Sequence, residues 1–243
     1  MTTFDSLVNE YDAGRIGYAN DVYNTLVSFG LSPKAAILDA GCGTGLASGP
    51  LIENGYDVTG LDPSQPMLDV AKDHYPQATW VRGPAENMPF GDAAFNAVIC
   101  AQAFHHFEKT AAMNEIVRVL RPRGIAAIWW KSLMSDDPVK RLRDEVAQDM
   151  GIAPLPATWR GGFREFYGAG FSETAVRVIP WSTVVTLGKF LQYERSRKIV
   201  RDEFGPHVNE YFERLESRLR ETLGEGDPIL PLSYMQFLYL AKK

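Results

Sequence analysis

A carboxylate stands directly before three closely spaced glycines in this chain: Asp39 precedes Gly41, Gly43 and Gly45. Glycines after a strand let backbone N–H groups approach an anion at a helix N-terminus, so the glycines alone would suit a phosphate. A carboxylate at position 39 would repel a pyrophosphate, but it would attract the ammonium group of an amino acid. We therefore predict a site for a cationic cofactor that carries an amino acid, ahead of a dinucleotide site.

The glycine spacing and a second acidic residue narrow the choice of cofactor. A dinucleotide fingerprint, Gly-x-Gly-x-x-Gly, would need a third glycine at position 46, where the chain has Leu46. Asp62 closes the next apolar run, where an acid can accept hydrogen bonds from both hydroxyls of a ribose. Asp62 would suit NAD or any other adenosine, so Asp39 and the glycine spacing are what disfavour NAD.

Alternating strands and helices must position these residues. The residue pattern predicts strands at 35–39, 57–61, 79–82, 95–101, 124–130, 175–181 and 233–241, and helices at 20–29, 46–54, 64–74, 108–120, 137–150, 187–200 and 206–223. Strands that alternate with helices at this spacing indicate a parallel, doubly wound α/β sheet. Ligands bind such sheets at the carboxyl ends of the strands, which brings Asp39, Asp62, residues 85–90, Gln102 and the His105–His106 pair to one cleft.

Composition limits the class of protein. The chain has 243 residues, 45% of them hydrophobic, and a net charge of −5, which favours one α/β domain and disfavours a nucleic-acid-binding protein. No apolar run is long enough to span a membrane, and the N-terminus shows no signal pattern. No Cys/His cluster has metal-ligand spacing. We expect a cytoplasmic, metal-free monomer or homodimer whose partner is a small molecule.

Five motifs, in order along residues 35–131, carry a family resemblance: Leu38–Gly45, Leu61–Ser64 with Met67-Leu68, Ala85–Phe90, Phe95–Phe107 and Glu115–Pro122. Together they resemble the class I S-adenosylmethionine-dependent methyltransferases, especially the small-molecule "type 11" group. The one departure is Pro122-Arg123-Gly124, where the family usually has Pro-Gly-Gly in an exposed turn. The resemblance implies a Rossmann-like, seven-stranded, mostly parallel sheet with an antiparallel last strand, and a single domain over residues 1–243.

The resemblance also implies which residues bind S-adenosylmethionine. The methionine end would be held by Asp39, Gly41, Gly43 and Gly45, the ribose by Asp62 beside Pro63, the adenine by Met67, Ala85 and Glu86, and the sulfonium would lie beside Gln102. S-adenosylhomocysteine would be the product, and no metal is implied.

Histidines after the fourth strand are the candidates for a catalytic base. His105, ahead of His106, could take a proton from the acceptor because histidine titrates near neutral pH. The chain has no Asn/Asp-Pro-Pro-Tyr motif after this strand and no paired acids for a catechol-type Mg²⁺ site. These absences favour methyl transfer to oxygen, nitrogen, carbon or sulfur of a small organic molecule. Methylation of a protein or RNA, and a non-catalytic cofactor-binding role, stay as alternatives.

Substrate specificity should come from a helical lid made of residues 1–30, 132–170 and 183–230, outside the core at 35–131. The lid is rich in aromatic and cationic side chains. The spacing of Tyr11, Arg15 and Tyr18 is similar to that of trans-aconitate-type carboxyl methyltransferases, in which an N-terminal segment closes over the site. We therefore hypothesise that a carboxylate-bearing substrate pairs with Arg15, Arg160 or Arg164.

Overall fold

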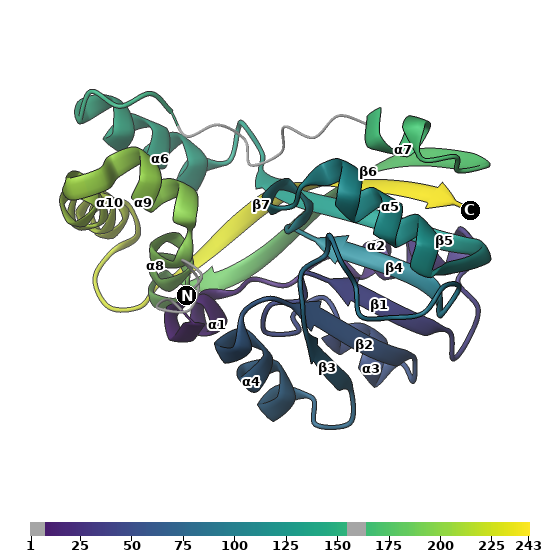
Figure 1. Cartoon of the computed structure of the whole chain (residues 1–243). Coiled ribbons are helices and arrows are strands. Elements are labelled where there is room, and N and C mark those ends of the chain that lie inside the picture. The colour runs from purple at the N-terminus through teal and green to yellow at the C-terminus, as the bar shows by residue number, and fades with distance from the viewer. Residues whose placement is uncertain (1–7, 155–163) are drawn as a thin grey trace.

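Seven strands form one mixed sheet in the computed structural model, which describes residues 8–154 and 164–243 (Figure 1). They are β1 (Ala36–Ala40), β2 (Asp57–Asp62), β3 (Thr79–Arg82), β4 (Phe95–Ala101), β5 (Leu120–Leu133), β6 (Glu173–Thr186) and β7 (Ile229–Lys242). Their order is β3-β2-β1-β4-β5-β7-β6; the first five are parallel, and β7 runs antiparallel to both of its neighbours. The predicted doubly wound sheet with an antiparallel last strand is confirmed.

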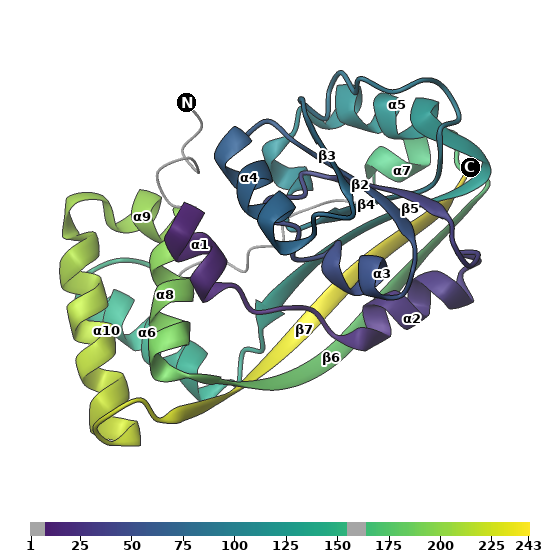
Figure 2. The same ribbon diagram turned by 90° about the horizontal axis from the view of Figure 1, so that it is seen from below.

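Helices cover both faces of this sheet (Figure 2). One face packs against α2 (Asn20–Ser28) and α3 (Gly49–Glu53), and the other against α5 (Lys109–Val119) and α7 (Arg164–Gly168); α4 (Gln65–His74) lies beside β2 and β3. Side chains alternate between the faces of a strand. On β1, Leu38 joins the core on the α5 face, whereas Ile37 joins the core on the α2 face. Asp39 shares the parity of Ile37 and therefore points toward the α2 face.

A separate helical group, here called the cap, stands at one end of the sheet (Figure 1). It consists of α6 (Pro138–Asp149), α8 (Leu187–Ser196), α9 (Lys198–Phe204) and α10 (Val208–Leu223), which share one hydrophobic core with the outer ends of β6 and β7. Strands β6 and β7 thus belong to the sheet and also contribute side chains to the core of the cap. Among the described residues, no helix is both long and apolar enough to cross a membrane.

Helix α1 (Val8–Gly14), which the sequence pattern did not predict, joins the cap to the rest of the molecule. A Cβ at Gly14 would lie 2.4 Å from the backbone nitrogen of Tyr193 on α8, so the two backbones are in close contact. Asp12 Oδ2 lies 2.9 Å from His74 Nε2 on α4. After α1 the chain passes the buried Lys131, whose ammonium group donates to the carbonyls of Ile16 and Gly17.

Other predicted elements differ from the structure. The helix expected over 46–54 spans only Gly49–Glu53, because residues 46–48 continue the glycine turn. The helix expected over 187–200 breaks at Arg197, which has an extended backbone (φ −79°, ψ 113°). Of the segments expected in the lid, α2 packs on the sheet through Val22 and Leu26, and α7 packs beside α5 through Phe166.

Candidate active site

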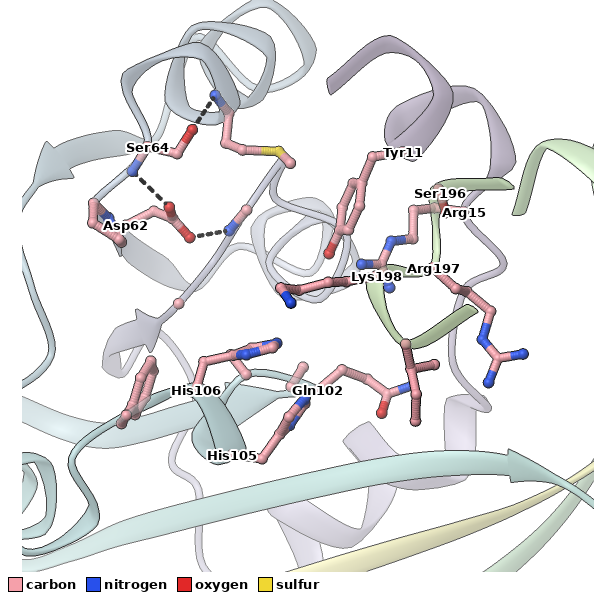
Figure 3. Close-up of a pocket in the computed structure, with 18 of the residues that line it drawn as sticks. Tyr11, Arg15, Asp62, Ser64, Gln102, His105, His106, Ser196, Arg197 and Lys198 are labelled. Carbon is pink, nitrogen blue, oxygen red and sulfur yellow. Dashed lines mark hydrogen bonds between the residues drawn. The ribbon is translucent and has the colours of Figure 1, made fainter. Parts of the chain in front are cut away.

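A cavity of about 450 Å³ opens at the carboxyl ends of the parallel strands, between the sheet and the cap (Figure 3). Residues from every side of this cleft line it: Tyr11, Arg15, Gly41, Gly43, Asp62, Pro63, Ser64, Met67, Ala101, Gln102, Ala103, His105, His106, Phe107, Tyr193, Ser196, Arg197, Lys198, Ile199, Asp202 and Glu203. Pockets of this size commonly hold small ligands. The cleft predicted at the carboxyl edge is therefore present, and α1, α8 and α9 form its far wall.

Asp62 holds the glycine turn in shape from the end of β2. Its Oδ2 accepts from the backbone N–H of Gly43 at 3.0 Å, and its Oδ1 accepts from the backbone N–H of Ser64 at 2.9 Å (Figure 3). Gly43 has φ +54°, and a Cβ there would lie 3.5 Å from the Tyr11 hydroxyl across the cavity. Glycine adopts this backbone conformation without strain, and both Gly43 and Asp62 line the cavity.

Gly41 and Gly45 serve packing as well as the turn. Gly41 has φ +73°, and a Cβ there would lie 2.6 Å from the Cβ of Ala103. Gly45 has φ +80°, and its Cβ would lie 2.8 Å from the indole of Trp80. Gly41 lines the cavity, whereas Gly45 does not. Close approach of another part of the chain thus explains Gly45 without any ligand.

Asp39 is fully buried behind the glycine turn, and only one of its two carboxylate oxygens has a hydrogen-bond partner among the described residues. Its Oδ2 accepts from the Ser48 hydroxyl at 2.7 Å, but its Oδ1 has no hydrogen-bond partner among the described residues. Burial raises the pKa of Asp39 to about 7, the nearby charge of Asp62 adds to this, and the bond from Ser48 opposes it. A buried carboxylate oxygen without a donor is costly, so it points to a bound donor such as an ammonium or an ordered water.

The end of β4 brings three polar side chains into the cavity. Gln102 has φ +58°, rare for a residue with a side chain, and its amide donates to the carbonyl of Lys131 at 3.4 Å. The rings of His105 and His106 on the short helix η1 (Phe104–His106) follow, with centroids 3.9 Å apart. Solvent in the cavity reaches both rings, but protein encloses their other sides. This enclosure and the neighbouring cations lower the pKa of both histidines, that of His105 to about 4.

The wall opposite the sheet is cationic. The Arg15 guanidinium lies over the Tyr11 ring, 3.3 Å from its centroid, and its Nε has no hydrogen-bond acceptor among the described residues. Burial lowers the pKa of Arg15 to about 10, so it stays charged at neutral pH. Lys198 reaches the same space beside Tyr11 and Arg15 (Figure 3) and pairs with Asp202. Arg197 is held by the buried Glu194, 3.0 Å away.

The structure brings most of the predicted site residues together. Those lining the cavity are Tyr11, Arg15, Gly41, Gly43, Asp62, Pro63, Met67, Gln102, His105 and His106. Asp39, Gly45, Tyr18, Ala85 and Glu86 do not line it.

Three of the predicted site residues contact other parts of the chain or lie on an element away from the cavity. Tyr18 packs edge-on against Trp129, with ring centroids 5.6 Å apart. Glu86 accepts from the backbone N–H of Glu108 at 2.8 Å. Arg164 begins α7, which packs beside α5 at the other end of the sheet from the cap (Figure 1). Arg160 lies outside the described residues.

Sequence reasoning missed the cavity residues of α9. Lys198, Ile199, Asp202 and Glu203 line the cavity because the helix expected over 187–200 ends at Ser196 and restarts at Lys198. Neither glycine nor proline marks this break. A charged Arg197 between two amphipathic segments was the only local signal, and it resembles any exposed helical position.

The residues present fit S-adenosylmethionine. Asp39, with one oxygen lacking a partner among the described residues, and the backbone at Gly43 would suit the amino-acid end, and Asp62 and Met67 line the same cavity and would suit a nucleoside. For a metal, no group of three or more His, Cys, Asp or Glu side chains is placed to hold an ion in the part of the chain that the structure describes.

Comparison with known proteins agrees with this fit. A family model described as a methyltransferase domain matches residues 38–128. An uncharacterized methyltransferase of Mycobacterium tuberculosis is 38% identical over 132 residues, 54% of this chain and 52% of that protein, so the chain matches only about half the length of that relative. An uncharacterized methyltransferase-like protein of Schizosaccharomyces pombe is 30% identical over 193 residues, which cover 77% of this chain and 74% of that protein.

Among solved structures, a putative type II methyltransferase from Anaeromyxobacter dehalogenans has the same fold. It superposes with a TM-score of 0.68 at 23% identity and covers 94% of this chain and 97% of its own. The fold, the cleft and the matched segments together lead to one assignment. This chain belongs to the class I S-adenosylmethionine-dependent methyltransferases.

Proposed function

We propose that this protein transfers a methyl group from S-adenosylmethionine to a small organic acceptor. The observation that carries the proposal is a cavity that joins Gly43 and Asp62 to the cationic wall at Arg15. Bound S-adenosylmethionine supplies a methyl group on a sulfonium, so the protein mainly needs to orient an acceptor and exclude water. Walls from α1, α8 and α9 suit that task.

Calorimetry and a metabolite panel test this proposal. We expect S-adenosylmethionine and S-adenosylhomocysteine to bind and NAD to show no binding. Methyl transfer should then be detected with at least one small molecule from a panel of organic acids, amines, phenols and thiols. Binding of NAD alone would overturn the proposal, and cofactor binding without turnover of any acceptor would favour a non-catalytic role.

Methylation of a protein or RNA is the second candidate. It shares the cofactor site, and it would need an accessible surface for a large substrate next to the cavity. Two observations favour the small molecule: cap helices and α1 wall the cavity, and the chain has a net charge of −5. Methylation of RNA or of a protein lysate, but of no metabolite, would reverse this preference.

A carboxylate on the acceptor would explain the cationic wall. Arg15 lines the cavity and stays charged at neutral pH, and its buried Nε has no hydrogen-bond acceptor among the described residues. Guanidinium groups bind carboxylates through two parallel hydrogen bonds. We therefore infer that Arg15 pairs with an acidic acceptor. The spacing Tyr11, Arg15, Tyr18 supports similarity to trans-aconitate-type enzymes only as a prediction, because Tyr18 packs on Trp129 instead of lining the cavity.

Arg15→Gln is expected to raise the KM for an acidic acceptor by about 100-fold, with a smaller change in kcat, because a charged contact in an enclosed site is lost. Arg15→Lys should recover part of the affinity, and Arg214→Gln, an exposed arginine paired with Glu210, is the matched control. Initial-rate kinetics measure both parameters. An Arg15→Gln variant that binds S-adenosylhomocysteine more weakly, but keeps its KM, would assign Arg15 to the carboxylate of the cofactor and contradict this inference.

Because the pKa of Asp39 is raised to about 7, we expect the affinity for the cofactor to depend on pH. The pKa of Asp39 lies above the ordinary value because the carboxyl is buried, so below pH 7 it carries a proton and cannot pair with an ammonium. Binding of an ammonium should therefore strengthen as pH rises, by up to about tenfold per unit below pH 7, and level off above it.

Calorimetry of S-adenosylhomocysteine from pH 5.5 to 8.5 would measure this dependence. The control ligand 5′-methylthioadenosine has no amino-acid group and should show no such slope. Asp39→Asn should bind S-adenosylhomocysteine more weakly and without the slope. An unchanged slope in Asp39→Asn would show that another group titrates.

A further inference from the structure

A hydrogen bond from a core tryptophan to a side chain of the cavity wall sets which nitrogen of His105 carries the proton. The indole Nε1 of Trp130 lies 3.1 Å from His105 Nδ1. An indole N–H can only donate, so Nδ1 must accept. A neutral imidazole has one N–H, and with Nδ1 as the acceptor that proton must be on Nε2.

Trp130 is fixed well enough to impose this arrangement. It lies on β5, is 4% exposed and belongs to the core on the α5 face of the sheet. Its ring packs edge-on against Tyr239, with centroids 6.0 Å apart. Since Trp130 lies behind the histidine, the opposite edge of the imidazole, with Nε2, is turned away from the core. His105 lines the cavity, so that edge is the one presented to a ligand.

The surroundings of His105 keep the ring neutral. Enclosure by protein disfavours the imidazolium most, and positive charge on His106, which stacks obliquely on the ring, and on Lys109 at the start of α5 disfavours it further. These three influences all lower the pKa of His105, to about 4. Near neutral pH the ring therefore has no vacant nitrogen on the cavity side that could accept a proton.

We propose that His105 is a hydrogen-bond donor to the acceptor substrate, and that its Nε2–H selects small molecules that present a carbonyl or carboxylate oxygen to this wall. The proposal rests on the proposed methyl-transfer function and changes the role expected for His105 from base to substrate-binding residue. A base, where the acceptor needs one, would then have to be another group, and His106 is the nearest histidine.

Nitrogen NMR of the folded protein tests the tautomer without any substrate. Long-range proton–nitrogen correlation of ¹⁵N-labelled protein, saturated with S-adenosylhomocysteine, distinguishes protonated from unprotonated ring nitrogens; His105→Gln identifies the signals. We expect His105 with Nε2–H and a bare Nδ1, unchanged from pH 6 to 8. Trp130→Phe should let the Nδ1–H form appear. Trp129→Phe is the matched control, because its indole nitrogen has no hydrogen-bond partner among the described residues.

Kinetics with an acceptor from the metabolite panel test the role. His105→Ala should raise KM by about 3- to 10-fold, the loss of one neutral hydrogen bond, and His105→Gln should restore part of it because its amide also donates. A general base would instead lower kcat by about 10²- to 10⁴-fold in both variants. An Nδ1–H tautomer, a ring that titrates between pH 6 and 8, or such a kcat loss would overturn the proposal. If no acceptor is methylated, the proposed function fails, and the NMR result still decides the tautomer.

Discussion

Asp62→Asn is expected to weaken the binding of S-adenosylhomocysteine by about 100-fold or more, because hydrogen bonds to a charged acceptor contribute about 1.5–3 kcal/mol each. In the proposed site the carboxylate accepts from both ribose hydroxyls. It already accepts from the backbone N–H groups of Gly43 and Ser64. An amide at position 62 can accept at only one of its two ends, so one of these N–H groups would face another donor. The glycine turn should loosen as well, at a cost of about 1–3 kcal/mol in the free energy of unfolding.

Calorimetry and thermal unfolding can separate these two effects. Asp69→Asn, an exposed carboxylate on α4 bonded only to Gln65 among the contacts resolved for it, makes the same charge change nearby and should leave both measurements unchanged. Adenosine and 2′,3′-dideoxyadenosine isolate the ribose: the wild type should prefer adenosine, and Asp62→Asn should lose most of that preference. If the variant bound S-adenosylhomocysteine within twofold of the wild type, Asp62 would have only the structural role.

The sheet and its glycine turn were predictable because their signals are local. Short apolar runs define β1, β2 and β4, and the amphipathic stripe of α5 appears within a dozen residues. Asp39 is informative in the sequence because a carboxylate beside a glycine turn would repel a phosphate and attract an ammonium group. The structure adds that Asp39 is buried and that one of its oxygens has no hydrogen-bond partner within residues 8–154 and 164–243, which no sequence pattern states.

The cap was less predictable because its order depends on contacts between distant segments. Glu194 is fully buried, with Arg197 three residues later and Arg143 from α6 as its ion-pair partners. A buried carboxylate needs such partners, but Glu194 and Arg197 resemble an ordinary surface pair in the sequence. Their pairing accompanies the break between α8 and α9, which turns Lys198 toward the cavity.

The family motifs predicted which segments of the chain reach the cavity better than they predicted the contacts of individual side chains. Ala85 and Glu86 were expected at the adenine, yet neither lines the cavity. The Glu86 carboxylate instead accepts from the backbone N–H of Glu108, just before α5 begins. Adenine contact by these two residues therefore stays a prediction, and S-adenosylhomocysteine binding by Glu86→Gln would test it.

Lys131→Met is expected to lower the free energy of unfolding by about 2–4 kcal/mol, although methionine nearly matches the shape of lysine. Lys131 is 1% exposed, and its ammonium group donates to the carbonyls of Ile16 and Gly17, in the link between α1 and α2. Removing the donors leaves the carbonyls of buried Ile16 and half-buried Gly17 without this partner. The rings of Tyr18 and Tyr234, 5.0 Å and 5.4 Å from the ammonium nitrogen, would keep the methionine packed, so the loss reports hydrogen bonding more than a cavity.

The same substitution should change how stability depends on pH. Burial lowers the pKa of Lys131 well below the ordinary value of lysine, so between these two pKa values the unfolded chain binds the extra proton. This group therefore makes the wild type more stable as pH rises, by up to about 1.4 kcal/mol per unit, and Lys131→Met removes that slope. The difference in unfolding free energy between wild type and variant should thus widen as pH rises toward the ordinary pKa of lysine in denaturant titrations.

Hydrogen exchange shows where the lost stability acts. Because Lys131 holds the link behind Arg15 and Tyr11, faster exchange in Lys131→Met should concentrate in residues 8–18 and spare β1 and β4. Lys72→Met, the same substitution at an exposed site on α4, should change neither exchange nor stability. If Lys131→Met lost hydrogen-exchange protection throughout the chain, Lys131 would stabilise the whole fold and not this link in particular. A variant as stable as wild type, with α1 still protected, would show that the contacts of α1 with α8 hold this wall of the cavity alone.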